Sequence, residues 1–187
     1  MQSPQQGDAW TQANDGASLS QGSKIKTEEN SGTLKLGNTT TLDIQPNTLI
    51  EVEALTDNNS TLLLQEGEFT AHVTGLPTGG SLKIDMSQAT AEITGTVFTV
   101  TETGTESTLS VKEDSVAFTS KVDGETVTVA AGEKVTATAG GLGSLTETET
   151  PNAYTLIAVA VVVSAVIIIV AVLGIKKRKL SRKTKEA

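Results

Sequence analysis

Residues 92–100, EITGTVFTV, are the stretch from which the fold is predicted. Apolar and polar residues alternate through it, which is typical of a strand with one buried face. Gly95 interrupts the alternation, although strand interiors avoid glycine because it costs backbone entropy and contributes no side chain. We therefore expect a bend or bulge at Gly95 that lets Ile93 and Phe98 both reach the core. If φ is positive there, Gly95→Val would destabilise the domain by about 2 kcal/mol or more through backbone strain.

Similar short segments of alternating residues run from residue 16 to residue 138, separated by turn residues. Turn signals recur about every 8–12 residues, and no segment of this region has the 3.6-residue period of a helix. The sequence therefore predicts an all-β domain over 16–138, either a sandwich or a twisted, solenoid-like roll. Residues 1–15 are expected to be flexible or to hold a shortened first strand. Residues 139–153, rich in glycine, threonine and glutamate, are expected to form a solvated stalk.

The 22 residues 154–175 contain no charged residue. As a helix, at about 1.5 Å per residue, they would span roughly 33 Å, the thickness of a bilayer's hydrocarbon core. Valine and isoleucine dominate the segment, but in lipid a single segment satisfies its backbone hydrogen bonds only as a helix. We therefore predict a transmembrane helix from Tyr154 to Ile175 and not a buried core segment. Within it, Ala160 and Ser164 form a small-xxx-small pair, a weak signal for a homodimer through the span.

Charge is distributed unevenly along the chain. Residues 176–187 hold seven basic residues and one acidic residue, whereas 1–175 hold seven basic and 21 acidic residues. Lysine and arginine beside a span stay on the cytoplasmic side, so the run Lys176, Lys177, Arg178 and Lys179 predicts a cytoplasmic tail in contact with the bilayer and an N-terminal domain outside the cell membrane. A tail-anchored protein with its body in the cytoplasm would instead require the positive tail to cross. Residues 1–23 contain no apolar run that could be a signal peptide, and we expect the sequence to lack its original start.

The composition excludes several kinds of site. The chain has no cysteine and one histidine, so disulfides, thiolate zinc sites and multi-histidine metal sites are ruled out. The formal net charge of -8 argues against nucleic-acid binding by the main domain. His72 alternates with apolar neighbours and is expected on the exposed face of a strand. We therefore expect no catalytic residue, no metal and no cofactor, and a protein that is not an enzyme.

Carboxylates two residues apart could in principle form a paired-acid site. Glu51 and Glu53 share one strand face, as do Glu66 and Glu68, but this spacing is more often a solvated face, and no aromatic platform for a sugar accompanies either pair. Residues 56–61, TDNNST, resemble half of a calcium loop but lack the closing glutamate of an EF-hand.

Three Asn-x-Ser/Thr sequences could accept an N-linked sugar if the domain is outside the cell. They begin at Asn38, Asn58 and Asn59. All three lie in expected turns or at their ends, where an acceptor would be reachable.

The order of the strands and glycines resembles that of the FecR domain, the extracytoplasmic unit named for the ferric-citrate regulator. The resemblance covers residues 10–138 and rests on five segments in order, each weak by itself. The opening segment is GASLSQGSKIKTEENSGTLKL, followed by NTTTLDIQPNTLIEV, LLLQEGEFTAHV, ATAEITGTVFTV and the closing strands STLSVKEDSVAFTS and ETVTVAAGEKVTAT. The positions that match the family's pattern are Gly67, Gly95, Thr96, Phe98 and Gly132. The resemblance implies an all-β roll or solenoid-like domain.

This sequence departs from ferric-citrate-type regulators in its order of parts. Those regulators carry a cytoplasmic sigma-factor-controlling segment, then a span, then the domain, whereas here the domain comes first and the span last. A 12-residue basic tail is too short to fold around a sigma factor, so anti-sigma activity is not carried over. We expect a non-enzymatic binding or signalling module with an unknown envelope or membrane protein as partner. The alternative is a structural or adhesive cell-envelope protein.

Overall fold

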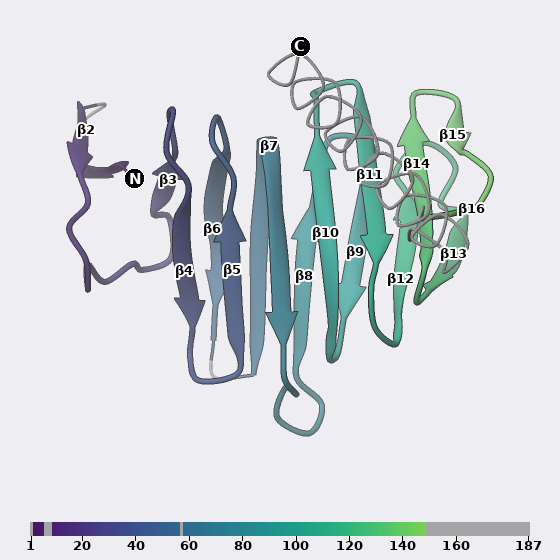
Figure 1. Ribbon diagram of the computed structural model, residues 1–187, viewed down its shortest axis with the longest axis horizontal. Coiled ribbons are helices and arrows are strands. Elements are labelled where there is room, and N and C mark those ends of the chain that lie inside the picture. The colour runs from purple at the N-terminus through teal and green to yellow at the C-terminus, as the bar shows by residue number, and fades with distance from the viewer. Residues whose placement is uncertain (1, 6–8, 57, 149–187) are drawn as a thin grey trace, which may run out of the picture. The chain divides into compact units, whose positions relative to one another are not determined.

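The computed structural model describes residues 2–5, 9–56 and 58–148, and every regular element in these residues is a β-strand (Figure 1). The all-β prediction is therefore confirmed for this part of the chain. The strands form one continuous sheet that folds over on itself, and we call its two halves sheet A and sheet B. The predicted span at 154–175 and the tail at 176–187 lie outside the described residues. Within the described residues, no helix long and apolar enough to cross a membrane is found.

Sheet A contains nine strands of the described chain, including the first part of the long strand β7. They are β1 (Gln2–Gln5), β2 (Ala9–Gln12), β3 (Lys24–Lys26), β6 (Leu49–Leu55), β7 (Asn59–Val73), β8 (Ser81–Asp85), β9 (Ala89–Ile93), β12 (Ser115–Ser120) and β13 (Thr126–Ala130). Their order across the sheet is β2-β1-β3-β6-β7-β8-β9-β12-β13, and all neighbours are antiparallel except β7 and β8.

Sheet B contains the second part of β7 and seven further strands. They are β4 (Gly32–Leu36), β5 (Thr40–Ile44), β10 (Thr96–Glu102), β11 (Glu106–Val111), β14 (Glu133–Thr138), β15 (Gly141–Leu142) and β16 (Thr146–Glu147). The order is β4-β5-β7-β10-β11-β14, with β15 and β16 both paired to the far side of β14, and every pair is antiparallel.

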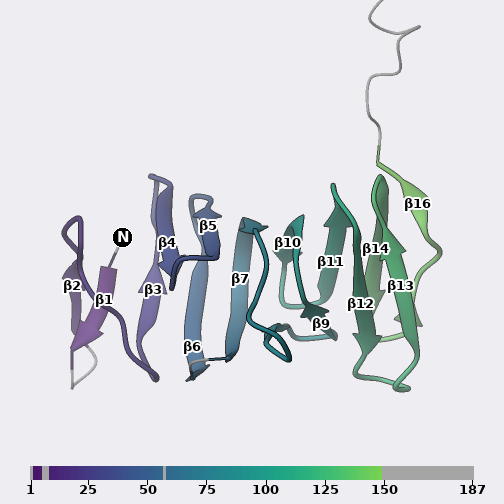
Figure 2. The same cartoon turned by 90° about the horizontal axis from the view of Figure 1, so that it is seen from below.

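Successive hairpins alternate between the two sheets. The hairpin β8–β9 belongs to sheet A, β10–β11 to sheet B and β12–β13 to sheet A again. Successive hairpins therefore lie one after another from one end of the domain to the other (Figures 1 and 2). The strand β7 belongs to both sheets, since its first part pairs with β6 and β8 and its second part with β5 and β10. This arrangement has the two layers of a sandwich and the one-directional growth of a solenoid.

The core lies between the sheets and is built from alternate residues of each strand. In β10, for example, the burial pattern is strictly alternating. Phe69 of β7 and Phe98 of β10 are both fully buried, and their rings meet edge to face with centroids 6.4 Å apart. Leucine, isoleucine and valine from nearly every strand fill the rest of this layer. The polar residues that alternate with the buried ones form the two outer faces. There, threonine hydroxyls form hydrogen bonds between neighbouring strands, as those of Thr70 and Thr99 do.

Two expected boundaries differ from the structure. Residues 139–148, expected as the start of a solvated stalk, include β15 and β16, which cover the edge of β14. Short strands of this kind need little apolar sequence because the backbone supplies their hydrogen bonds. Residues 1–15, expected to be flexible or a shortened strand, include the antiparallel pair β1–β2, which extends sheet A beyond β3.

Candidate functional site

Gly67 is the point at which β7 passes from sheet A to sheet B. Its φ is +98°, and a Cβ built there would lie 2.4 Å from the hydroxyl and 2.5 Å from the Cα of Thr48, and 2.7 Å from the carbonyl oxygen of Asn47. Only glycine tolerates both the backbone conformation and the contact. The glycine therefore lets the corner between β5 and β6 pack directly on β7.

That corner is held by two buried threonines, which the sequence pattern does not single out as a pair. The Thr48 hydroxyl donates to the Glu68 carbonyl at 3.1 Å and accepts from the Glu68 N–H at 3.0 Å. The Thr27 hydroxyl donates to the Gln45 carbonyl at 2.6 Å and accepts from the Thr48 N–H at 2.9 Å. Both side chains are almost completely buried. They thereby attach the corner to the backbone of β7, where the Glu68 carbonyl also accepts from the Gln45 N–H.

Gly95 lies with Thr94 in the bend between β9 and β10, where the chain crosses from sheet A to sheet B. The structure therefore replaces the expected bulge within one strand by a corner between two strands. Ile93 and Phe98, on either side of the corner, are fully buried. Thr96 is buried as well, and its hydroxyl donates to the Glu113 carbonyl.

Gly95→Ala is expected to change the free energy of unfolding by no more than about 1 kcal/mol. The φ angle of Gly95 is not in the left-handed region. A Cβ added at Gly95 would lie at ordinary contact distances, 3.7–3.9 Å, from the backbone of Val73 and Gly75. The strain argued for Gly95→Val from a positive φ therefore does not apply. Urea unfolding of the two proteins measures the difference, and a loss above 2 kcal/mol for the alanine variant would contradict this account of the corner.

Gly132 forms the tight turn between β13 and β14, a second crossing between the sheets. Its φ is +83°, and nothing lies within 4 Å of a Cβ built there. The Gly132 N–H donates to the Val111 carbonyl, and the Gly132 carbonyl accepts from the N–H of Thr148. Glycine is therefore favoured here by the backbone conformation, since the space that a Cβ would take is open.

The titratable residues considered in the sequence lie apart on the outer faces. His72 is about half exposed, on sheet B, with its Nε2 3.5 Å from a carboxylate oxygen of Asp43. Glu51 pairs with Lys24 at 3.4 Å on sheet A, whereas Glu68 accepts from the Thr101 hydroxyl on sheet B. Glu53 and Glu66 are exposed. In residues 2–5, 9–56 and 58–148, no group of three histidine or acidic side chains could hold a metal ion.

The segment that resembles half of a calcium loop, where no metal was expected, leads into β7. The Thr56 hydroxyl donates to the Asn59 carbonyl and accepts from the Asn59 N–H, each at 2.9 Å. Asp57 lies outside the described residues. The oxygen of Thr56 is therefore used to close the turn.

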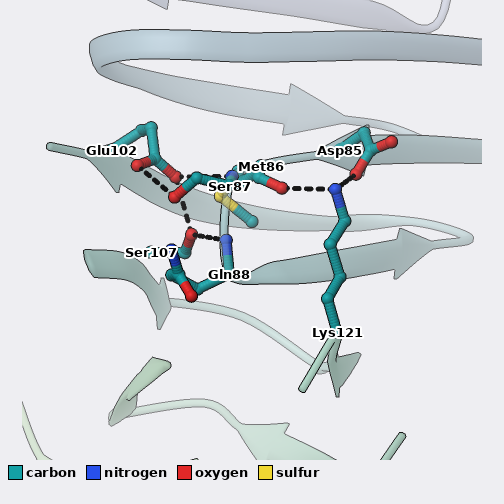
Figure 3. A network of polar contacts seen from close by, with 7 residues as sticks. All are labelled: Asp85, Met86, Ser87, Gln88, Glu102, Ser107 and Lys121. Carbon is teal, nitrogen blue, oxygen red and sulfur yellow. Dashed lines mark hydrogen bonds and ion pairs between the residues drawn. The ribbon is translucent and has the colours of Figure 1, made fainter. Parts of the chain in front are cut away.

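A buried carboxylate forms a further polar centre, between the β8–β9 turn and the β10–β11 turn (Figure 3). Glu102 is 1% exposed and accepts four hydrogen bonds, which occupy both of its oxygens. The donors are the N–H and hydroxyl of Ser87 at 3.0 and 2.7 Å, the Gly104 N–H at 2.6 Å and the Ser107 hydroxyl at 2.6 Å. The Ser107 oxygen accepts in turn from the Gln88 N–H at 3.0 Å.

This network ties a turn of sheet A to a turn of sheet B. A carboxylate accepts about four hydrogen bonds, so Glu102 has no capacity left for a substrate or an ion.

Beside the Glu102 network, the Lys121 ammonium forms an ion pair with Asp85 and donates to the Met86 carbonyl, which fixes the same β8–β9 turn against the end of β12 (Figure 3). Both groups therefore stabilise the fold. The alternation in β10 indicates that Glu102 is buried, because Glu102 lies on the same strand face as Phe98 and Val100.

One exposed carboxylate has a shifted pKa. The Glu125 N–H and the Ser120 hydroxyl donate to Asp123 and hold the pKa of its carboxyl below the usual value. The Asp123 carboxylate also lies 2.9 Å from where a Cβ of Gly141 would be. It orders the β12–β13 turn, on the surface of the domain.

The edges of the two sheets are the parts of the domain that could bind another chain through backbone groups. Strands β15 and β16 cover β14, and at the β13 edge the Glu133 carboxylate accepts from the Ala130 N–H at 2.9 Å. Strand β4 pairs with β5 alone among the described strands. Its Leu34 lies in the core, its Lys35 is exposed on the outer face, and sheet A continues past it through β1 and β2 (Figure 2).

A family model described as FecR protein matches residues 23–117, slightly more than half of the chain. The chain belongs to the FecR protein family. This confirms the resemblance found in the sequence, and the matched region extends from β3 into β12 of the FecR domain. A search of curated proteins returned no match.

Solved structures with the same fold include two crystal structures, at 1.65 and 2.50 Å, of a candidate anti-sigma factor from Parabacteroides distasonis ATCC 8503. Each has a TM-score of 0.57 and 15% sequence identity, and each alignment covers 67% of this chain. The chain spans 59% of the length of that protein. At this identity the likeness shows the fold alone.

Proposed function

We propose that this FecR domain is a non-enzymatic signalling module, displayed outside the cell and held to the membrane by one span at 154–175. The family and the fold support a regulatory role. The uncharged 22-residue segment and the basic residues that follow it support the topology.

The open edge of β4 is the observation that carries the binding role. An unpaired strand edge offers N–H and C=O groups in a fixed row, and an added strand gains main-chain hydrogen bonds while its alternate side chains set specificity. At β4, the buried Leu34 would contact inward-facing side chains of the added strand, and the exposed Lys35 would contact an outward-facing one. No ion pair of Lys35 occurs among the described residues, so an acidic residue of the partner could lie opposite it.

Protease treatment of intact cells tests the topology. Addition of protease should remove the FecR domain and leave the span with its tail, detected by an antibody against residues 176–187. Protection of the domain in intact cells, together with digestion after lysis, would show that the body is inside.

Site-specific photo-crosslinking tests the binding edge. A photo-reactive amino acid at position 35 on β4 should give a crosslink to one defined membrane or envelope protein. The matched control is position 83, which lies on the outer face of the central strand β8 of sheet A and should give no such product. Equal crosslinking from both positions would exclude the β4 edge as the site. Crosslinks only to abundant envelope material would favour a structural or adhesive protein.

A further inference from the structure

The three Asn-x-Ser/Thr sequences meet at one end of the FecR domain. Asn38 lies in the turn between β4 and β5, and Asn58 in the turn before β7, whose first residue is Asn59. Asn38 and Asn58 both line one open groove of about 260 Å³ between the two sheets. The apolar part of its lining is formed by Leu36, Leu55, Leu76, Pro77 and Leu82, and none of its described lining residues is charged.

The side chains of Asn58 and Asn59 are in different situations, although the residues are adjacent. The Asn59 side-chain oxygen accepts from the N–H of Ser81 at 3.1 Å and from the Ser81 hydroxyl at 3.2 Å. It thereby fixes the start of the parallel pair β7–β8, in which Asn59 lies opposite Ser81. All three asparagines are exposed, but the side chains of Asn38 and Asn58 make no hydrogen bond within the described residues.

The hydroxyl residue of each acceptor sequence lies in a paired strand. Thr40 pairs on both sides in sheet B, and Ser60 and Thr61 pair on both sides in sheet A. An enzyme that reads this hydroxyl must therefore act before the strands form. The fold then decides which product is accepted. A sugar on the nitrogen of Asn38 or Asn58 points to solvent, whereas the side-chain oxygen of Asn59 is held by Ser81, so a sugar on the nitrogen of the same amide group would be fixed beside the start of β8.

We infer that Asn38 and Asn58 carry N-linked sugar, that Asn59 does not, and that the sugar covers the groove. In the transfer, the side-chain nitrogen of asparagine bonds to the anomeric carbon of an oligosaccharide carried on a lipid diphosphate. The bond from that carbon to the diphosphate oxygen breaks, the lipid diphosphate leaves with the electron pair, and one amide proton is released. The sugar would shield Leu55, which is 40% exposed at this end of the domain.

This inference rests on the outward-facing topology proposed above. The full chain is purified from its own membranes, cleaved with a glutamate-specific protease and analysed by mass spectrometry with fragmentation that keeps sugars attached. Sugar masses are expected on Asn38 and Asn58, with Asn59 unmodified. Sugar on Asn59, or an unmodified chain, would overturn the inference. If protease shaving shows the domain outside and the chain is unmodified, the proposed function stands and only this inference fails.

Variants expressed in the same host separate the three positions. N38Q and N58Q should each lower the intact mass by one sugar chain, and the double variant should have the mass of the bare polypeptide. N59Q should keep the full sugar mass, because it leaves the acceptor sequence of Asn58 intact. Transfer of the sugar to Asn59 in the N58Q protein, with normal folding, would contradict the role given to the Ser81 contact.

Discussion

Gly67→Ala should be the most damaging single substitution in the FecR domain, with a loss of about 4 kcal/mol in the free energy of unfolding. Two costs combine at this position. A residue with a side chain resists φ of +98°, and its Cβ would lie 2.4–2.7 Å from Thr48 and Asn47. The corner at Thr48 would have to move away from β7 and break its hydrogen bonds to Glu68. For a domain of ordinary stability this is a large part of the total.

Gly132→Ala is the matched control, and chemical denaturation of the purified domain compares the three proteins. Gly132 also has a positive φ, +83°, but a Cβ added there would meet nothing within 4 Å. Its alanine variant should therefore lose only the conformational cost, about 1–2 kcal/mol. Similar losses for the two variants would show that the close packing of Thr48 on Gly67 contributes little.

The strands were predictable because their alternation is local. Each inward residue of 89–100 is apolar or a threonine and each outward residue is polar or β-branched, so the burial of Ile93, Phe98 and Val100 follows from the pattern. The resemblance to the FecR domain added the order in which these strands follow one another along the chain. Both sources describe the chain over short distances, and both gave the correct class of fold.

The assignment of strands to sheets was not predictable from the same pattern. A period of two residues is the same in sheet A and sheet B. In β7 its phase changes around Gly67, from Leu62 and Leu64 inward to Phe69 and Ala71 inward, but a change of phase does not say which strands pair on either side of it. The bend at Gly95 shows the same limit, since a glycine marks either a bulge or a corner. Which one forms depends on partners far away in sequence, such as Val73, which pairs with Thr96.

The polar ties between the sheets were missed for a related reason. Thr27 directly follows β3 and Thr48 directly precedes β6, in a chain rich in threonine, and only the fold brings their hydroxyls to the backbone of Gln45 and Glu68. Glu102 was detectable as an acid in an inward position, but two of its four donor groups belong to Ser87 in the β8–β9 turn, 15 residues away in sequence. The open edge of β4 likewise follows from which strands pair, a non-local property.

Glu102→Gln should be the second severe substitution, with a loss of about 3 kcal/mol or more. The variant keeps the size of the side chain but replaces one acceptor oxygen by an NH₂ group that can only donate. Each carboxylate oxygen accepts from one backbone N–H and one serine hydroxyl. The hydroxyl that faces the NH₂ group can turn to accept from it, but the backbone N–H of Ser87 or Gly104 would remain without an acceptor in a buried site. Hydrogen bonds to an ionised group are also stronger than those to an amide. Thermal and urea unfolding at neutral pH measure the loss.

Glu53→Gln is the control for the loss of one negative charge, because Glu53 is exposed on β6, and it should change stability by less than about 0.5 kcal/mol. Ser107→Ala removes one donor to Glu102 and the acceptor of the Gln88 N–H, so its loss should be smaller than that of Glu102→Gln. In the double variant the two losses should not add, since both remove parts of one network. Full additivity, or equal stability of the Glu102→Gln and Glu53→Gln proteins, would mean that the two turns are held together by apolar packing and that the buried carboxylate contributes no net stability.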